Sequence, residues 1–349
     1  MAKSVTILDV AARAGVSKSA ASLALRGTGY VSEAKRRAVL EAAAELGYRP
    51  NAAARAMGSA RSGTVGLILD DLRNPWFVPA VEGLSDGLHA AGLSPLLGDW
   101  RLEGAAVAER FLELRVEGLV LVGTLDGAET ALPSLAGIPV VQVGSPVAQV
   151  PGAAVVTNDD AEGARRVIRH LAALGHRRIA HLSAPGTPVG EARRAGFEDE
   201  ARHAGIEAST VPGGLTEEAG RRAALEALRQ DPRPTALFAV NDMAAFGALS
   251  AAEELGLGVP GDVSLAGYDD TPASRLRAVG LTSVDNASRE AGRVAADLLA
   301  QRIAGAQDSG PRGADDGGTE PPAVVLLTPE LKARSSTAPP PAPPTGVVR

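Results

Sequence analysis

The sequence contains no cysteine among its 349 residues and few aromatic side chains. Without thiols the chain can form no disulfide and can offer no thiolate to a metal or a substrate. Lysine is also scarce, and none of the four lysines follows a glycine, which excludes a phosphate-binding loop of the GxxxxGK[ST] type. These absences exclude thiol enzymes and nucleotide hydrolases that depend on such a loop.

Metal-site spacings and long hydrophobic runs are missing as well. The five histidines show no HExxH or other spacing that is typical of a metal site. No apolar run is long enough to cross a membrane, and the N-terminal MAKSVTILDV carries no stretch typical of a signal peptide. We therefore expect a cytoplasmic protein that is not an enzyme and requires neither a cofactor nor a metal.

Charge is distributed unevenly along the chain. The net charge is -6, yet residues 1–63 carry ten Lys or Arg and four Asp or Glu, which gives this segment +6 and the remainder -12. A basic module on an acidic body would be attracted to phosphates through that module alone. The distribution favours a nucleic-acid partner for the N-terminal segment.

The segment from Thr6 to Arg26 predicts two short helices joined by a tight turn. Thr6 can cap the first helix, with Asp9 in its first turn, and Gly15 ends that helix because this place usually needs positive φ. Ser17 can cap the second helix, whose outward residues are small, polar or basic. Such an arrangement is typical of a DNA-reading helix-turn-helix. A helical hairpin inside an all-α core fits these residues alone equally well.

A third helix and a short alanine-rich run follow. Ser32 can cap a helix over Glu33–Leu46 that covers the first two, and Gly47 ends it. Tyr48–Asn51 cannot continue the helix, because proline restricts the residue before it. Asn51 can cap the run AAARAMG, which has high helix propensity but is too short to be stable alone. We expect this run to fold only against a partner.

After Gly63, apolar runs alternate with helical patterns. Strands are predicted at Thr64–Leu69, Ser94–Leu97, Gly118–Val122, Pro139–Val143, Ala154–Thr157, Arg178–Leu182, Ala236–Val240 and Val263–Gly267. Helices are predicted between them at Val78–Ala91, Val107–Leu114, Ala161–Leu174, Ala192–Ala204, Glu217–Gln230 and Asp242–Leu255. This alternation indicates an α/β fold with parallel sheets covered on both faces. Two such halves would form a cleft at the carboxyl ends of their strands.

Motifs along nearly the whole chain resemble those of the LacI/GalR family of transcriptional repressors. They include VTILDVAARAGVS, VSEAKRRAVLEAAAELGYRPN, VGLILDDLRNPWF, LGHRRIAHLS, PTALFAVNDMAAFGAL and LTPELKARSST, in the family's order. The resemblance implies a homodimer whose headpieces bind a pseudo-palindromic operator in double-stranded DNA. It also implies a two-subdomain, periplasmic-binding-protein-like effector domain that binds a small molecule, with a sugar or sugar derivative as our best prediction.

The resemblance also implies a division of the chain. We expect a headpiece over 1–47, a hinge with a DNA-induced helix over 48–62, an effector domain over 63–337 and a disordered proline-rich tail over 338–349. The N-subdomain would comprise about 63–160 and 286–324, and the C-subdomain about 161–285 and 325–337. Residues 304–322, rich in Gly, Asp and Pro, are interpreted as a flexible excursion.

The DNA contacts are expected on the second helix, its flanks and the hinge. These residues are Thr6, Ser17, Lys18, Ser19, Ser22, Leu23, Arg26, Asn51, Arg55 and Met57. Many relatives carry arginine where Leu23 stands, and leucine can meet only a thymine methyl, so the operator would differ from the family's usual one. Met57 stands where the family places a leucine that is wedged between base pairs.

The ligand contacts are expected at strand ends and on one helix of the effector domain. These residues are Asp70, Trp76, Phe77, Asp159, Arg193, Asn241 and Asp269. Core packing is the alternative for Trp76 and Phe77, and helix capping is the alternative for Asp159. Carboxylate, amide and guanidinium groups around an aromatic ring suit a polyhydroxylated ring. Gly144 stands where relatives often carry a ligand-binding aspartate, so the identity of the sugar stays open.

Two alternatives share the fold. A stand-alone periplasmic sugar-binding protein would explain residues 63–337, but the attached headpiece and the missing signal peptide argue against it. A repressor of the same fold that uses a corepressor other than a sugar would show the same motifs and the same pattern of strands and helices. No leucine heptad is present that would build a tetramer through a coiled coil.

Overall fold

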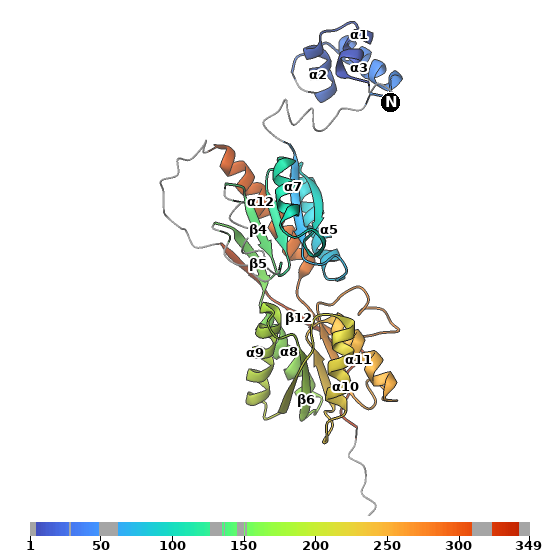
Figure 1. The fold of residues 1–349 in the computed structure, drawn as a ribbon, viewed down its shortest axis with the longest axis vertical. Coiled ribbons are helices and arrows are strands. Elements are labelled where there is room, and N and C mark those ends of the chain that lie inside the picture. Colours follow the sequence, from blue (N-terminus) through green and yellow to red (C-terminus); the bar gives the residue numbers. More distant parts are fainter. Residues whose placement is uncertain are drawn as a thin grey trace, which may run out of the picture. The chain divides into compact units, whose positions relative to one another are not determined.

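The computed structural model describes residues 5–27, 29–48, 62–125, 135, 137–144, 150, 152–308 and 323–341. The chain divides into two compact units, Met1–Ser62 and Gly63–Arg349. The first unit is helical, and the second consists of two α/β subdomains (Figure 1). Among the described residues, no helix has both the length and the apolar character needed to cross a membrane.

The first unit is the predicted bundle of three helices. They are α1 (Ile7–Arg13), α2 (Lys18–Arg26) and α3 (Glu33–Glu45). Their shared core consists of small side chains, namely Val10, Ala11, Ala21, Ala24, Val39, Ala42 and Ala43. Helices this short are marginal alone, so their stability depends on this mutual packing.

Local hydrogen bonds fix the starts of α1 and α2 where the sequence predicts them, whereas the side chain of Ser32, the expected cap of α3, makes no capping hydrogen bond. The carboxylate of Asp9 accepts hydrogen bonds from the backbone N–H of Thr6 at 2.8 Å and from Thr6 Oγ1 at 2.7 Å. Ser17 Oγ accepts from the N–H of Ala20 at 3.2 Å, which caps α2. Gly15 adopts a φ of +65° just after α1, a conformation that glycine adopts without strain. The turn between the first two helices is therefore encoded locally.

The second unit contains two six-stranded sheets. The N-subdomain sheet has the order β11-β5-β4-β3-β1-β2, and the C-subdomain sheet has the order β12-β10-β9-β8-β6-β7. The first comprises β1 (Thr64–Leu69), β2 (Ser94–Asp99), β3 (Leu119–Val122), β4 (Val140–Val143), β5 (Ala154–Asn158) and β11 (Val324–Leu327). The second comprises β6 (Arg178–Ser183), β7 (Glu207–Pro212), β8 (Ala236–Ala239), β9 (Ser264–Tyr268), β10 (Thr282–Asp285) and β12 (Glu330–Lys332). Described neighbours run parallel, except that β12 is antiparallel to β10.

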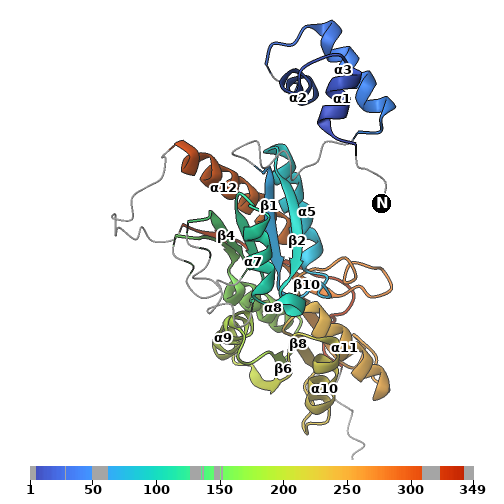
Figure 2. The same cartoon turned by 45° about the horizontal axis from the view of Figure 1, so that its top comes forward.

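Helices cover both faces of each sheet (Figures 1 and 2). In the N-subdomain they are α5 (Phe77–Ala90) and α12 (Ser288–Asp308) on one face, and α6 (Trp100–Glu103) and α7 (Ala106–Glu113) towards the other. In the C-subdomain they are α8 (Asp160–Ala173) and α9 (Pro188–His203) on one face, and α10 (Glu217–Leu228) and α11 (Asp242–Glu254) on the other. Apolar strands with two covered faces are typical of parallel sheets, so the predicted fold class is confirmed.

Two glycines let α5 and α12 approach closely. A Cβ built on Gly83 would lie 2.0 Å from the carbonyl oxygen of Arg289, and one on Gly87 would lie 2.6 Å from Ala296 Cβ. These glycines flank Ser85 with GxSxG spacing, the spacing of a nucleophile elbow. The segment lies inside a helix here and not at a strand-to-helix turn. The spacing therefore serves helix packing.

The chain crosses between the subdomains three times. The first crossing leads from β5 into α8, and the second leads from β10 into α12. The third lies between Leu327 and Glu330, because β11 still pairs with β5 in the N-subdomain while β12 pairs with β10. The boundary at 325, which the family resemblance implied, falls too early, because Val325 still lies in a strand of the N-subdomain sheet.

Other differences concern the last part of the chain. Helix α12 runs to Asp308, so residues 304–308 are helical and not part of an excursion. Ala338 is not the start of a disordered tail. Its N–H donates to Ser264 Oγ at 3.0 Å, and its carbonyl lies 2.9 Å from His176 Nε2. The four short or late strands β7, β10, β11 and β12 were not predicted, and neither was α6 or α12.

Candidate functional site

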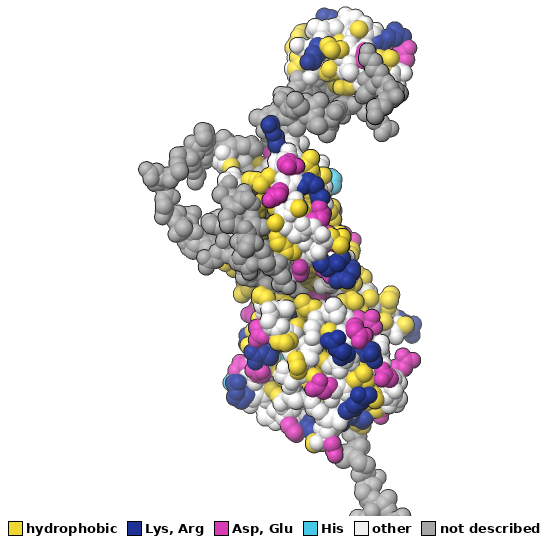
Figure 3. Space-filling view, viewed as in Figure 1, with side chains coloured by type: hydrophobic (Ala, Val, Ile, Leu, Met, Phe, Trp, Pro, Cys, Tyr) yellow, Lys and Arg dark blue, Asp and Glu magenta, His cyan; other side chains and the backbone are white. Residues whose placement is uncertain are grey.

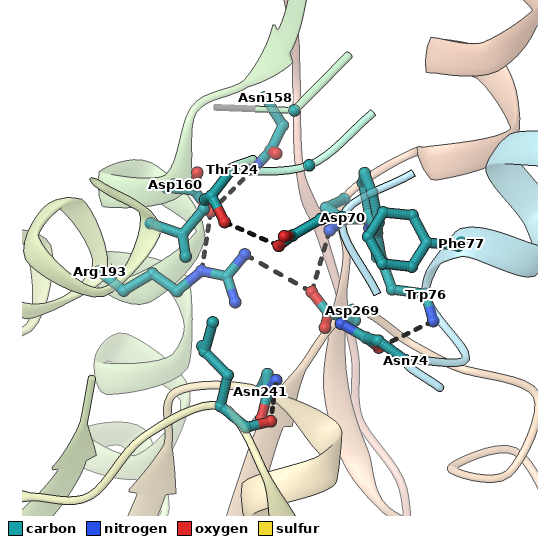
Figure 4. A pocket seen from close by; sticks show the side chains of 15 residues that line it. Asp70, Asn74, Trp76, Phe77, Thr124, Asn158, Asp160, Arg193, Asn241 and Asp269 are labelled. Atoms are coloured by element: carbon teal, nitrogen blue, oxygen red, sulfur yellow. Dashed lines mark hydrogen bonds and ion pairs between the residues drawn. The ribbon is translucent and has the colours of Figure 1, made fainter. Parts of the chain in front are cut away.

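The pocket that collects most of the predicted ligand residues lies where the carboxyl ends of the strands of both sheets meet. Its empty volume is about 530 Å³, including space open to solvent. Its lining is polar around an aromatic pair and comprises Asp70, Asn74, Trp76, Phe77, Gly123, Thr124, Gly144, Asn158, Asp160, Val189, Arg193, Leu215, Asn241, Asp269 and Asn286. Figure 4 shows Trp76 and Phe77 on one side of this space and Arg193 and Asn241 on the other.

The N-subdomain wall is built from residues that follow β1 and β3. Asp70 follows β1, and its Oδ2 accepts a hydrogen bond from Thr124 Oγ1 at 2.8 Å. Trp76 precedes α5 and Phe77 begins it, with their ring centroids 5.1 Å apart in an edge-to-face arrangement. Asn74 Oδ1 holds the backbone N–H of Trp76 at 3.0 Å. Phe77 is buried, so the core-packing alternative fits it better than it fits the half-buried Trp76.

Gly144 brings the backbone close to Trp76. It has a φ of +93°, and a Cβ built on it would lie 3.4 Å from Trp76 Cη2. An aspartate there would be strained by this φ and would stand against the indole edge. The glycine therefore leaves this edge of the ring uncovered by a carboxylate.

The C-subdomain wall is centred on Arg193, which projects from α9 and is 4% exposed. Its Nε donates to Asp160 Oδ1 at 2.8 Å, and its Nη1 donates to the carbonyl of Val240 at 2.7 Å. Its Nη2 lies 3.5 Å from Asp269 Oδ1, and the guanidinium stacks 3.6 Å above the ring of Tyr268. Burial alone would lower the pKa of Arg193, but Asp160 and Asp269 hold it above its ordinary value.

Among the carboxyl groups of the site, Asp269 has the most unusual backbone conformation and the most strongly raised pKa. It follows β9 with a φ of +105°, a conformation that residues other than glycine rarely adopt. Asn286 Nδ2 donates to its Oδ1 at 3.1 Å. Burial raises the pKa of Asp269 to about 8, with Arg193 opposing the rise and Asp242 and Asp160 adding to it. Two buried carboxylates share one guanidinium here, and Asp269 has the looser contact.

Asp159 was wrongly expected to line the pocket. Its Oδ1 accepts from the N–H of Glu162 at 2.8 Å and caps α8, which is the alternative that the sequence allowed. Its neighbour Asp160 lines the pocket instead, because the first turn of α8 directs that side chain towards Arg193. Asn241 lines the pocket but also caps α11, with its Oδ1 2.9 Å from the N–H of Ala244 and its Nδ2 donating to Leu215.

Sequence reasoning missed five polar residues of the lining: Asn74, Thr124, Asn158, Asp160 and Asn286. Asn158 ends β5, and its Nδ2 donates to Tyr268 Oη at 2.9 Å. Asn286 follows β10, a strand that was not predicted. The usable signal was the position of Thr124 and Asn158 at the ends of predicted strands, where ligands of open α/β sheets bind.

The first unit presents part of the predicted DNA-contacting set on α2. Ser17, Lys18 and Ser19 are exposed, and Ser22 and Leu23 are half-buried. The side chain of Leu23 lies beside Gly29, where a built Cβ would approach its Cδ2 to 3.1 Å. Leu23 therefore packs against the loop at Gly29, and the half-buried side chain keeps some surface for contact with DNA.

The remaining predicted DNA contacts are described only in part. Thr6 caps α1, and its hydroxyl is bound by Asp9. Arg26 is the last residue of α2, and its side chain lies outside the described residues. Asn51, Arg55 and Met57, and with them the predicted hinge helix, also lie outside the described residues.

Comparison with known proteins assigns both units. Residues 6–51 match the family model of bacterial regulatory proteins of the lacI family, and residues 168–337 match a periplasmic binding protein-like domain. The HTH-type transcriptional repressor PurR of Erwinia tasmaniensis is 33% identical over 309 residues, which covers 85% of this chain and 90% of that protein.

Solved structures agree with this assignment. The lac repressor dimer bound to operator and an anti-inducer has a TM-score of 0.80 at 28% identity, covering 96% of this chain and 100% of that one. The complex of the transcriptional regulator CelR with cellobiose has a TM-score of 0.66 at 29% identity, covering 95% and 99%. The chain belongs to the LacI family: it is a DNA-binding transcriptional repressor with a periplasmic-binding-protein-like ligand domain.

Proposed function

We propose that a sugar or sugar derivative binds in the cleft between the subdomains and controls the affinity of this repressor for its operator. The observation that carries the proposal is the pairing of the half-buried Trp76 ring with a surrounding rim of carboxylates, amides and a hydroxyl. A sugar ring has an apolar face that can stack on indole and hydroxyls that can bond to such a rim. The related regulator CelR in complex with cellobiose is consistent with this ligand class.

The site would convert binding into a shape change because its two walls belong to different subdomains. Asp70 and Trp76 come from the N-subdomain, and Arg193 and Asp269 from the C-subdomain. A ligand that contacts both walls favours one relative position of the subdomains by its differential affinity for it. The hinge over 48–62 would pass this change on to the headpiece.

On the DNA side, we propose a homodimer that places two headpieces on a pseudo-palindrome. Each α2 would lie in the major groove, with Ser17, Lys18, Ser19, Ser22, Leu23 and Arg26 facing the DNA. Each hinge would fold in the minor groove, with Asn51 and Arg55 at the backbone and Met57 as the wedge. The relevant test is operator affinity against salt, which should fall steeply, because phosphate contacts release counterions. An affinity that stays flat from low to physiological salt would contradict this picture.

The two tryptophans offer a sharp test of the ligand site. Trp76 lines the cleft, whereas Trp100 lies in α6 and is not part of the lining. In a Trp100→Phe variant, Trp76 is the sole source of indole fluorescence, and titration with a binding sugar should change its emission. In the matched Trp76→Phe variant, the remaining Trp100 should stay silent. A sugar that binds but changes only the Trp100 signal would show that the ligand sits elsewhere.

The class of effector is tested by a thermal-shift screen of the full-length protein over a sugar library, since a ligand that binds the folded state raises its melting temperature. Hits are then added to operator gel-shift assays, and a true effector must change the operator affinity. A library without a hit, together with a hit among non-sugar metabolites, would replace the sugar with a corepressor of another class.

A further inference from the structure

One cation of the first unit lies on the core-facing side of its helix. Arg36 is half-buried on α3, whereas the other described basic side chains of this unit are exposed. It precedes Val39 by three residues and Ala43 by seven, and both belong to the core of the three-helix bundle. Residues at this spacing share one face of a helix. The stem of Arg36 therefore packs beside the core, which restricts the position of its guanidinium.

The guanidinium of Arg36 has no partner within the part of the chain that the structure describes. Its Nε is buried and makes no hydrogen bond there. Glu33 stands three residues earlier, the spacing of an ion pair across a helix turn, yet no ion pair joins these two described side chains. The two Nη atoms of Arg36 also lack a partner among the described residues, but they are not buried, so they reach solvent.

Arg13 of the same unit shows the contrasting case of an arginine that supports the bundle. Its Nη2 lies 2.7 Å from Glu45 Oε1, and this ion pair joins α1 to α3. Arg36 makes no such link, and a buried donor without an acceptor destabilises a fold. Arg36 therefore contributes little to the bundle and keeps its outer N–H groups for a partner outside it.

The beginning of α3 lies near the exposed face of α2. A Cβ built on Gly29 would approach Leu23 Cδ2 to 3.1 Å, so the loop after α2 returns to a residue of the predicted DNA-contacting set. Ser32 follows Gly29 by three residues, which span at most about 11 Å. The N–H of Arg36 donates to the carbonyl of Ser32 at 2.9 Å. Arg36 thus starts from a turn close to the face that α2 presents.

We propose that Arg36 is a further DNA contact, whose guanidinium binds a backbone phosphate beside the half-site that α2 reads. This inference rests on the proposed DNA-binding mode, in which α2 lies in the major groove. Residues 1–63 carry a net charge of +6, and Figure 3 shows basic side chains on this unit, whereas basic and acidic ones are intermixed on the C-subdomain. The N–H groups of a guanidinium match phosphate oxygens. A phosphate would supply the counter-charge that the bundle lacks.

The test compares three variants of the full-length protein on two duplexes. One duplex is selected by the wild-type protein from a random pool, and the other has an unrelated sequence. Arg36→Met removes the guanidinium and keeps an apolar stem, and Arg36→Lys keeps the charge. Arg13→Met is the matched control, because it removes an equal charge from an ion pair of the same unit. Fluorescence anisotropy measures the affinity over a series of salt concentrations.

The expected result is a weaker dependence on salt in one variant. Arg36→Met should flatten the slope of log affinity against log salt by roughly two, one phosphate contact for each subunit of a dimer. Its affinity for both duplexes should fall by the same factor, since a phosphate contact carries no sequence information. Arg36→Lys should keep most of the slope, and Arg13→Met should keep the wild-type slope.

A second measurement separates a DNA contact from support of the fold. Hydrogen exchange of the α2 and α3 amides, followed by mass spectrometry, reports the local stability of the bundle in the full-length protein. Arg36→Met should retain the wild-type protection, because the guanidinium has no partner among the described residues of the bundle. Loss of protection together with loss of affinity would assign Arg36 to the fold and overturn the inference.

The other outcomes distinguish this inference from the proposed function. A slope in Arg36→Met equal to that of the wild type, a loss confined to the selected duplex, or an equal flattening in Arg13→Met overturns the phosphate contact and leaves the proposed DNA-binding mode intact. A wild-type slope that is flat, or a pool from which no duplex is selected, contradicts the proposed mode itself, and this inference fails with it.

Discussion

The two walls of the cleft differ in how far the protein uses their hydrogen-bonding groups itself. On the C-subdomain wall, Arg193 is committed to Asp160, Val240 and Asp269, and Asn241 is committed to a helix cap. On the N-subdomain wall, Asp70 accepts from Thr124, and Trp76 presents an indole whose Nε1 has no hydrogen-bond partner among the described residues. One wall is a buried charged network, and the other is a more open rim.

A residue can contribute to a binding site by stabilising the fold around it or by contacting the ligand, and the two walls differ in which contribution prevails. A group in the charged network supports the fold of the C-subdomain, so changing it disturbs stability before it disturbs binding. A group on the open rim contributes less to stability and can be changed to read out the ligand. The comparison predicts effects of different size for similar substitutions on the two walls.

The largest effect is expected for Arg193→Met, which leaves Asp160 buried without its counter-charge. Breaking a buried ion pair in this way costs about 3–5 kcal/mol of unfolding free energy. Urea denaturation followed by circular dichroism measures the loss. The matched control is Arg194→Met, because Arg194 is 38% exposed and its pairs with Glu191 and Glu198 lie at the surface. That control should lose less than about 1 kcal/mol, and equal losses in both variants would remove the distinction between the walls.

An effect that depends on pH is expected for Asp269→Asn. The ordinary carboxyl pKa of 3.8 is raised to about 8 in the folded chain by burial, so between these values the folded state holds a proton that the unfolded state has lost. The free energy of unfolding therefore falls as pH rises through this window, by at most about 1.4 kcal/mol per pH unit, and levels off above it. The variant lacks this titration.

The measurement is the difference in unfolding free energy between wild type and Asp269→Asn, taken from about pH 5 to about pH 9. The stability of the wild type relative to the variant should decrease across this range. Asp71→Asn is the control, because hydrogen bonding from Arg73 lowers the pKa of Asp71 to about 2, outside the window. A difference that does not change with pH would show that Asp269 is ionised throughout.

The smallest effect on stability is expected for Asp70→Asn on the open rim. The asparagine oxygen can still accept from Thr124 Oγ1, so the unfolding free energy should change by less than about 1 kcal/mol. Ligand affinity, measured with the sugar identified by the thermal-shift screen, should nevertheless fall because a charge-assisted acceptor is lost. A stability loss as large as that of Arg193→Met would show that both walls are structural networks.

The sequence alone determined the features that depend on residues close to one another along the chain. The caps at Thr6 and Ser17, the turn at Gly15 and the alternation of buried strands and helices follow from local chemistry and periodicity. These features were sufficient to predict the three-helix unit and the parallel α/β architecture. The family resemblance also predicted Asp70, Trp76, Phe77, Arg193, Asn241 and Asp269 as ligand contacts, and all six line the pocket.

Tertiary structure decided what depends on residues far apart in the chain. Whether Asp159 or Asp160 faces the cleft depends on the rotational position of α8, which its packing sets. The sheet that β11 joins and the place of Asn286 beside Asp269 arise from pairing across the subdomain crossings. The commitment of Arg193 to buried carboxylates also required the folded C-subdomain, because burial is what turns neighbouring charges into a shared network, and no spacing along the chain encodes burial.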